Sequence, residues 1–253
     1  MGKSIDNLLP KRLKAAADLI PCCDTACDIG CDHGYLSVYL LQHKKARRMI
    51  AMDVNRGPLE RAKESAALYG MTAQMDFRLS DGLAQIVPGE AEFFICAGMG
   101  GKLIIKIMSD YPKTTVSMRG ALLQPQSDIR AVRRFAYDSG WHIEREDIIF
   151  EEDGGERKTG KYYPMFLVSQ GRESIPSDEE LAYGAVSKQQ SPGVLRAFLL
   201  YQLEVREKAK LQLKKSETPR ARERQYKLEE EIREINTVLK KLPQRTEPSE
   251  RQM

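Results

Sequence analysis

The sequence predicts an α/β fold with a mainly parallel β-sheet, one antiparallel strand at the sheet edge, and a helical hairpin near the C-terminal end. Strand-like and helix-like segments alternate from about residue 25 to residue 140, which is the pattern of consecutive β-α-β units. From about residue 190 the pattern changes to two long polar stretches with apolar residues at coiled-coil spacing.

The strands predicted in the alternating region are short and apolar, and most are followed by polar or glycine-containing residues. They span residues 25–30, 48–53, 75–79, 91–97 and 120–124, and helices are predicted over 5–20, 35–43, 59–69, 101–109 and 129–139. Two further strand patterns, 141–151 and 162–169, follow each other without a helix between them. Because consecutive strands pair as a hairpin, we expect an antiparallel strand at that edge of the sheet.

The C-terminal region has the pattern of an antiparallel coiled coil. Its two helical stretches, 193–215 and 220–242, are separated by the breaker sequence SETP. Apolar residues recur at alternating intervals of four and three, namely at Val194, Phe198, Tyr201 and Val205 and at Leu228, Ile232, Ile235, Leu239 and Leu242. We therefore predict a main domain over residues 1–170, a linker over 171–191, an antiparallel coiled coil over 192–243 and a disordered tail over 244–253.

The composition excludes several classes of protein. Of the 253 residues 42% are hydrophobic and 30% are charged, and no apolar run is long enough to span a membrane. The charged N-terminal stretch is unlike a signal peptide, and the odd number of cysteines favours a reducing setting, so we expect a cytoplasmic protein. The cysteines lack C-x-x-C spacing, so we predict no metal site.

Positive charge is concentrated in the C-terminal part. From Lys188 to Met253, 16 Lys and Arg stand against 10 Asp and Glu, a balance of +6, whereas residues 1–187 carry 24 against 26, a balance of −2. A basic appendage on a near-neutral domain indicates a polyanionic partner such as RNA. The alternative is a solvated helical surface that happens to be rich in Lys and Arg.

The end of the first predicted strand and the turn that follows it, ACDIGCDHGY, have an unusual composition for a ligand-binding turn. A dinucleotide-binding loop needs three glycines around a pyrophosphate, but this loop has only Gly30 and Gly34. It also carries Asp28 and Asp32, which would repel a diphosphate. The loop therefore favours a ligand with positive charge and no phosphate.

S-adenosylmethionine is a cofactor of this kind. We expect Asp28 to bind its ammonium group, Asp53 its ribose hydroxyls and Asp81 its adenine amino group, while Gly30 allows a close approach of the backbone. The alternative is that each acid only caps the following helix. The other predicted cofactor-binding residues come from the same strand ends: Cys31, Gly34, Tyr35, Val54, Asn55, Gly82, Ala97, Gly98, Met99 and Gly100.

Several motifs together resemble one family. The segments DIGCDHGYL, DVNRGPLERA, RLSDGL, GMGGKLI and LQPQSDIRAVRRF are similar to those of the bacterial tRNA (adenine-22-N1)-methyltransferases. The resemblance covers about residues 5–170, and a C-terminal helical hairpin is also typical of the family. It implies a Rossmann-like class I methyltransferase sheet, S-adenosylmethionine as methyl donor, and N1 of an adenine in tRNA as acceptor.

Adenine N1 has its own lone pair, so the reaction needs no strong base, but its product is a cation. We expect Asp32 to stabilise that charge and His33 to accept a proton, although His33 is alternatively only a turn residue. Residues predicted to contact the substrate lie at strand ends, on the first helix and near the hairpin tip: Gln124, Lys11, Arg12, Tyr162, Lys214, Lys215, Arg220 and Arg222.

Two other functions remain open from the residues alone. The first is methylation of a small molecule or a protein, which would need no basic arm. The second is a non-catalytic RNA-binding protein that retains the cofactor fold. The helical hairpin is alternatively a dimerisation element, and we expect a monomer or a weak dimer.

Overall fold

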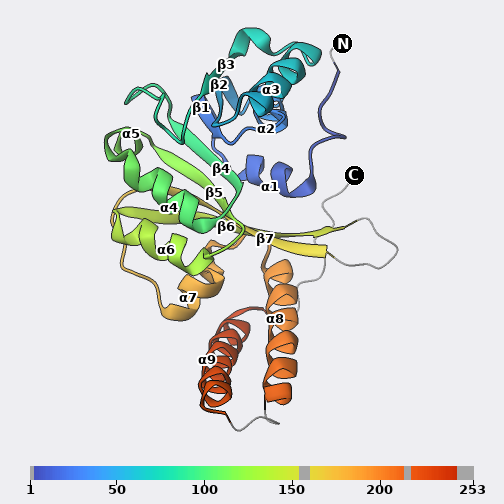
Figure 1. The fold of residues 1–253 in the computed structure, drawn as a ribbon, viewed down its shortest axis with the longest axis vertical. Coiled ribbons are helices and arrows are strands. Elements are labelled where there is room, and N and C mark those ends of the chain that lie inside the picture. Colours follow the sequence, from blue (N-terminus) through green and yellow to red (C-terminus); the bar gives the residue numbers. More distant parts are fainter. Residues whose placement is uncertain (1–2, 154–159, 214–217, 244–253) are drawn as a thin grey trace. The chain divides into compact units, whose positions relative to one another are not determined.

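The computed structural model describes residues 3–153, 160–213 and 218–243 (Figure 1). The chain divides into two compact units, Met1–Ile175 and Pro176–Met253. The boundary between them falls inside the stretch 171–191 that the sequence assigns to a linker. The predicted disordered tail over 244–253 lies outside the described residues.

The first unit is built on a seven-stranded sheet with the order β3-β2-β1-β4-β5-β7-β6. The strands β1 to β5 pair in parallel, and β7 runs antiparallel to both β5 and β6. The predicted mixed sheet is confirmed: its antiparallel pairing lies at one end, where β6 is the outermost strand. The strand bounds are β1 Cys23–Ile29, β2 Ala46–Asp53, β3 Met75–Leu79, β4 Phe93–Met99, β5 Gly120–Pro125, β6 Trp141–Glu152 and β7 Gly160–Gln170.

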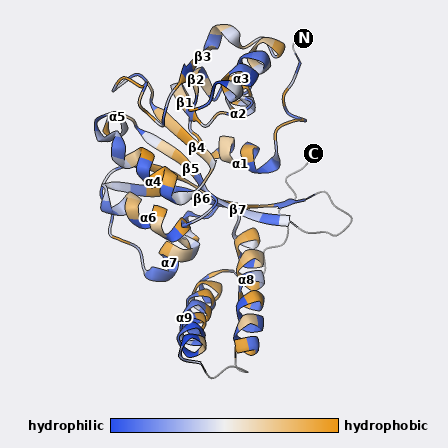
Figure 2. Ribbon diagram, in the orientation of Figure 1, coloured by the Kyte–Doolittle hydropathy of each residue, from blue (hydrophilic) through white to orange (hydrophobic). Residues whose placement is uncertain are grey.

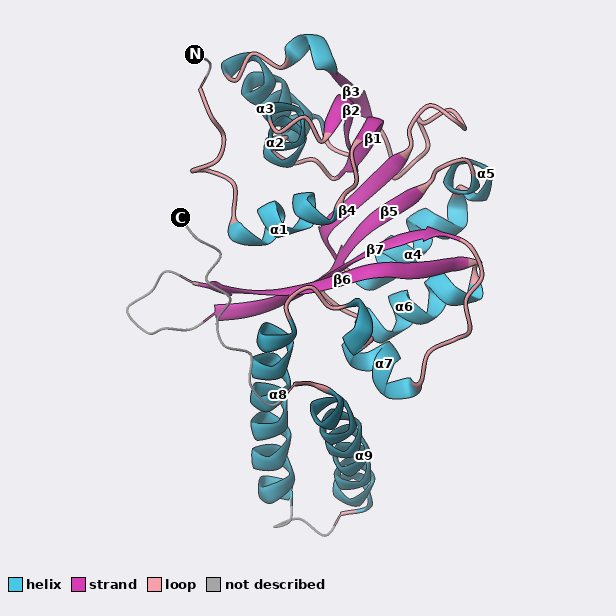
Figure 3. Ribbon diagram, turned by 180° about the vertical axis from the view of Figure 1, so that it is seen from behind, coloured by secondary structure: helices cyan, strands magenta, loops and turns pink. Residues whose placement is uncertain are grey.

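Helices cover both faces of this sheet (Figures 1 and 3). The helices α1 (Lys11–Leu19), α2 (Tyr35–Gln42) and α3 (Arg56–Leu68) pack on one face, and α4 (Gly101–Asp110), α5 (Pro112–Val116) and α6 (Ile129–Asp138) lie on the other. A short 3-10 helix, η1 (Thr72–Gln74), precedes β3. Because both faces are covered, the central strands are apolar along their length, as the hydropathy colours of β4 and β5 show in Figure 2.

The N-terminal segment enters the fold differently from the prediction. The prediction of a helix over 5–20 is wrong for its first residues, since α1 begins at Lys11. Pro10 disfavours the helical conformation of the residue before it, so the preceding residues form a turn instead. Ile5 and Leu9 are nevertheless buried, and the Ile5 amide donates to Gln42 Oε1 at 3.0 Å. The segment is thereby fixed against α2.

The second unit contains α7 (Asp178–Tyr183), the 3-10 helix η2 (Val186–Lys188), α8 (Pro192–Leu213) and α9 (Pro219–Lys241). The helices α8 and α9 form a helical hairpin. The helices α8 and α9 pack together, and Arg206 Nε of α8 donates to Glu231 Oε2 of α9 at 2.6 Å. Within the described residues, no helix is both long enough and apolar enough to cross a lipid bilayer.

The packing face of α8 differs from the predicted one. Leu195 and Leu199 are buried, whereas Tyr201 and Val205 remain 51% and 45% exposed. The predicted seam is therefore wrong at Tyr201 and Val205, whereas Val194 and Phe198 are half-buried. Two apolar stripes run along α8 at similar spacing, and periodicity alone does not decide which of them meets the partner helix. On α9 and at its C-terminal cap, the buried residues include Leu228, Ile235 and Leu242, as predicted.

Candidate active site

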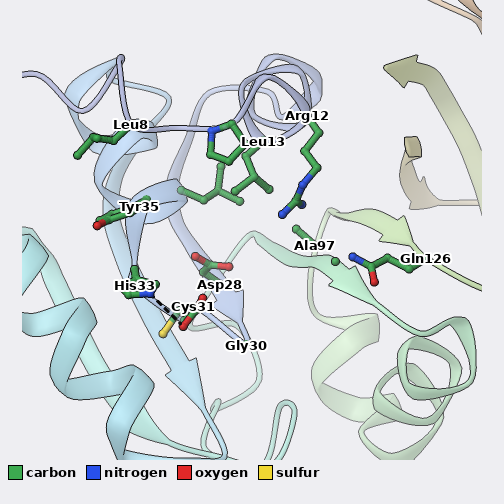
Figure 4. Close-up of a pocket in the computed structure, with 14 residues that line it drawn as sticks. Leu8, Arg12, Leu13, Asp28, Gly30, Cys31, His33, Tyr35, Ala97 and Gln126 are labelled. Carbon is green, nitrogen blue, oxygen red and sulfur yellow. Dashed lines mark ion pairs between the residues drawn. The ribbon is translucent and has the colours of Figure 1, made fainter. Parts of the chain in front are cut away.

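The carboxyl ends of β1 and β4 lie side by side where the order of the strands reverses. From β1 the chain proceeds outward through β2 and β3, and it then returns to β4 on the other side of β1. Ligands of open α/β sheets bind in the crevice that this reversal creates. A cavity of about 420 Å³ opens at this position (Figure 4).

The cavity is lined by residues from the N-terminal segment and α1, the end of β1 and the loop after it, the start of α2, the end of β4, and the loop after β5. They are Leu8, Pro10, Arg12, Leu13, Asp28, Gly30, Cys31, Asp32, His33, Tyr35, Leu36, Ala97, Gly98 and Gln126. The structure thus brings together most residues predicted from the first and fourth strand ends. Sequence reasoning missed Leu8, Leu13, Leu36 and Gln126 as residues of the site.

Asp28 is the most deeply placed acid of the cavity. It is 3% exposed and accepts a hydrogen bond from Ser37 Oγ at 2.8 Å. Burial raises the pKa of Asp28 from its ordinary value of 3.8 to about 6, and the hydrogen bond from Ser37 opposes this shift. No cation among the described residues pairs with it. A buried carboxylate in this state favours a cationic ligand.

Asp32 lies at the mouth of the cavity in a different environment. Its backbone is left-handed, with φ 47°, and its side chain is 64% exposed. Arg61 of α3, which sequence reasoning missed, places Nη2 2.7 Å from Asp32 Oδ1. His33 Nε2 lies 3.7 Å from the same oxygen, and the His33 ring stacks on Tyr35 with the ring centroids 5.3 Å apart. Asp32 and His33 are therefore both accessible from the cavity.

The shape of the loop depends on its two glycines. Gly30 and Gly34 have φ values of +71° and +68°, in the left-handed region that favours glycine. The amides of Gly30 and Cys31 both donate to the Met52 carbonyl, at 2.8 and 2.9 Å. A Cβ atom on Gly34 would lie 2.9 Å from Cβ and 3.1 Å from Cα of Ala62, so α3 approaches the loop closely.

The acids of the second and third strand ends do not line the cavity. Asp53 is 9% exposed at the end of β2, and its Oδ1 accepts from the Asn55 amide at 2.9 Å. Asp81 is exposed after β3, and its carbonyl accepts from Tyr111 at 3.0 Å. Val54 is 62% exposed, and Gly82 is buried with φ 58°. Their roles in cofactor binding stay predictions.

The wall opposite the acids carries hydrogen-bond donors. Gly98 has φ +77°, and a Cβ atom placed on it would lie 3.4 Å from Gln126 Nε2 and 3.7 Å from Arg12 Nη1. Met99 ends β4 and Gly100 caps α4, and neither residue lines the cavity. Gln124 is fully buried behind this wall and accepts from Arg12 Nη1 at 2.9 Å.

The remaining predicted substrate residues belong to several elements of the two units. Lys11 is exposed at the start of α1, and Tyr162 lies on β7, where its ring contacts Phe150 at a centroid distance of 4.8 Å. Arg220 and Arg222 are exposed at the start of α9 in the second unit. Lys214 and Lys215 lie outside the described residues. Their contacts with a substrate stay predictions.

Two cysteines at and near the cavity have buried thiols. Burial raises the pKa of the Cys31 and Cys96 thiols well above the ordinary value, so both remain protonated at neutral pH. In the part of the chain that the structure describes, no three His, Cys, Asp or Glu side chains gather as a metal site.

Known proteins match both the sequence and the fold. Residues 9–155 match the family model of a methyltransferase domain. The tRNA (adenine(22)-N(1))-methyltransferase of Bacillus subtilis is 32% identical over 179 residues, which are 71% of this chain and 70% of that protein.

Solved structures agree with this assignment. The B. subtilis m1A22 tRNA methyltransferase TrmK has a TM-score of 0.78 at 27% identity, covering 91% of this chain and 98% of its own. Streptococcus pneumoniae Sp1610 in complex with S-adenosyl-L-methionine has a TM-score of 0.76 at 26% identity, covering 91% of this chain and 99% of its own. The resemblance predicted from the motifs is confirmed: this chain belongs to the family of bacterial tRNA (adenine(22)-N(1))-methyltransferases.

Proposed function

We propose that this protein transfers a methyl group from S-adenosylmethionine to N1 of adenine 22 in tRNA. The observation that carries the proposal is the buried Asp28 at the base of a cavity at the carboxyl ends of β1 and β4. A carboxylate without a partner cation is suited to the ammonium group of this cofactor. The family of the chain supports the acceptor.

The residues of the loop after β1 would hold the cofactor. Asp28 binds the ammonium group, and the left-handed turn at Gly30 leaves room for the amino-acid part beside the backbone. Asp53 and Asp81 follow along the same edge of the sheet and serve the ribose and the adenine. When bound, S-adenosylmethionine supplies an activated methyl group, so the protein provides mainly orientation and electrostatics.

Asp32 and His33 act on the adenine. The side chain of Asp32 faces the mouth of the cavity, where a negative charge stabilises the cationic product. Arg61 holds this carboxylate in place by an ion pair of 2.7 Å. His33 lies beside it and accepts a proton as the product relaxes.

The helical unit would contact the body of the tRNA. Among the described cations of the α8–α9 hairpin, Arg220 and Arg222 are exposed and make no ion pair, whereas Lys208 and Arg224 pair with acids of the hairpin itself. Free guanidinium groups bind phosphates bidentately. We accordingly assign catalysis to residues 1–170 and RNA contact to 192–243, with a cytoplasmic location and a monomer or weak dimer.

The test is methyl transfer to unmodified tRNA. The full chain is incubated with isotopically labelled S-adenosylmethionine and in-vitro-transcribed tRNA, and the nucleosides are identified after digestion. We expect labelled N1-methyladenosine, and we expect a reverse-transcription stop at position 22. A transcript with guanosine at position 22 is the matched control and should remain unlabelled.

Two outcomes would contradict the proposal in different ways. Cofactor binding without labelled tRNA would favour a small-molecule or protein acceptor. The absence of cofactor binding at millimolar concentration would favour a non-catalytic RNA-binding protein.

A further inference from the structure

Arg12 is held at the cavity wall by three other elements of the fold. Its Nη1 donates to Gln124 Oε1 at 2.9 Å, and its Nε lies 3.5 Å from Glu151 Oε2. Its Cζ lies 5.2 Å from the centroid of the Tyr163 ring. These partners come from β5, β6 and β7, so they fix both the plane and the direction of the guanidinium group.

Both the oxygen and the nitrogen of the Gln124 side-chain amide form hydrogen bonds with Arg12. The side chain is fully buried, and its Nε2 donates to the backbone carbonyl of Arg12 at 3.4 Å. A direct contact between Gln124 and a substrate would require both of these hydrogen bonds to break. The sequence-based assignment of Gln124 as a substrate contact is therefore better replaced by a positioning role.

One edge of the Arg12 guanidinium group remains available. Among the described residues, Nη2 has no hydrogen-bond partner, and the side chain keeps 22% exposure while it lines the cavity. Its Nη1 lies beside Gly98 at the end of β4, where the Gln126 side chain also arrives. The guanidinium group thus lines the cavity on the side away from Asp28 (Figure 4).

The charge of Arg12 is balanced before any substrate arrives. Methylation of adenine at N1 produces a cation, and an unpaired guanidinium group beside it would oppose the reaction. Glu151 offsets this charge by its proximity to Nε. Arg12 is therefore suited to act as a directional hydrogen-bond donor to a base, more than as a cation that attracts phosphates.

We propose that Arg12 positions the target adenine by donating from Nη2 to one of its unreactive ring nitrogens, N3 or N7, and that Gln124 positions Arg12. The inference rests on the proposed function and identifies the residue that selects the orientation of the base. It divides the cavity into two sides. On the acid side Asp28 binds the cofactor, and on the guanidinium side Arg12, held by Gln124, orients the acceptor base.

The test compares Arg12→Lys and Gln124→Leu with the matched control Arg119→Gln. Arg119 has similar contacts, with Nη1 2.5 Å from Glu92 Oε2 and Cζ 5.2 Å from the Phe93 centroid. Arg119 precedes β5 and therefore lies at the amino ends of the parallel strands, whereas the cavity lies at their carboxyl ends. Steady-state methylation of tRNA and calorimetric binding of S-adenosylhomocysteine are measured for each variant.

We expect Arg12→Lys and Gln124→Leu to lower kcat/KM for tRNA by about 10- to 100-fold, because a hydrogen bond from a charged donor is lost or misaligned. Cofactor affinity should stay within about twofold, which also shows that the variants are folded. Arg119→Gln should match the wild type. If Arg12→Lys retains kcat/KM within about threefold, positive charge alone suffices and the inference is wrong.

Modified substrates separate a contact with the base from a structural role. The wild-type enzyme should lose about tenfold in kcat/KM with either 3-deazaadenine or 7-deazaadenine at position 22, and Arg12→Lys should show no further loss with that analogue. Equal losses in both proteins, or no loss with either analogue, would overturn the inference. A wild-type enzyme that fails to methylate natural tRNA would instead overturn the proposed function itself.

Discussion

The two sides of the cavity hold their charges in opposite ways. On the acid side, Asp28 is buried, the Ser37 hydroxyl is the only hydrogen-bond donor to its side chain among the described residues, and burial raises its pKa to about 6. On the guanidinium side, Arg12 is already held by Gln124 and Glu151. The acid side is thus incomplete without a cation from the ligand, whereas the guanidinium side is complete and offers one directional donor. The difference indicates which side binds the cofactor.

The largest effect is expected from Asp28→Asn. Cofactor affinity should fall by about 100-fold, because a charge-assisted hydrogen bond to the ammonium group is replaced by a neutral one. Calorimetry with S-adenosylhomocysteine measures this loss. An affinity within about threefold of wild type would show that the acid side does not carry the cofactor's charge.

The same substitution should stabilise the ligand-free protein. The folded-state pKa of Asp28 is raised, so its contribution to stability is present below pH 4 and is lost as the pH rises through 6. At pH 7.5 the ionised carboxylate therefore destabilises the fold, and Asp28→Asn should raise the free energy of unfolding by about 1 to 3 kcal/mol. Urea denaturation measures this gain, and the exposed Asp32→Asn should show none.

The second prediction concerns the glycine that shapes the acid side. Gly34→Ala should lower the free energy of unfolding by about 2 kcal/mol or more, because a left-handed alanine would also press on the Ala62 backbone. Gly70→Ala is the matched control, since its φ of +71° is close to the +68° of Gly34 but nothing lies within 4 Å of the added Cβ. Equal losses in the two variants would mean that the approach of α3 does not constrain the loop.

The third prediction is a pH dependence confined to the acid side. Asp28 must be ionised to pair with an ammonium group, so cofactor affinity should be constant from about pH 7 to 8 and fall as the pH drops through 6. Below that value we expect roughly a tenfold loss per pH unit. In Asp28→Asn this dependence should disappear, and its persistence would assign the titration to another group.

The smallest effect is expected from Asp32→Asn. Its ion pair with Arg61 is exposed, so the free energy of unfolding should change by less than about 0.5 kcal/mol. We expect kcat for tRNA to fall about fivefold without a change in cofactor affinity, because Asp32 acts on the cationic product. A loss of cofactor affinity instead would move Asp32 to the cofactor's binding site.

The acid side and the guanidinium side also differ in how far the sequence reveals them. Asp28, Asp32 and the glycines lie in one short loop, so local composition was enough to predict a cationic ligand without phosphate. Arg12 and Gln124 are 112 residues apart in the chain, and only the packing of α1 against the sheet brings them together. Arg61 was missed for the same reason, since nothing within α3 indicates that it faces the loop after β1.

In the fold as well, features set by the local sequence were predicted correctly, whereas features that depend on tertiary packing were not. The alternation of strands and helices predicted the sheet because each element has its own period. The start of α1 was placed too early, although Pro10 carried the signal. The seam of α8 was misassigned because Leu195 and Leu199 compete with a second apolar stripe, and the choice depends on the partner helix.

The most direct test of the account compares two ligands on two proteins by calorimetry. S-adenosylhomocysteine carries the ammonium group, whereas 5′-methylthioadenosine lacks the whole amino-acid part. We predict that the wild-type protein prefers S-adenosylhomocysteine by about 100-fold or more, and that Asp28→Asn reduces this preference to below about tenfold. The same preference in both proteins would contradict the assignment of the cofactor's cation to the acid side.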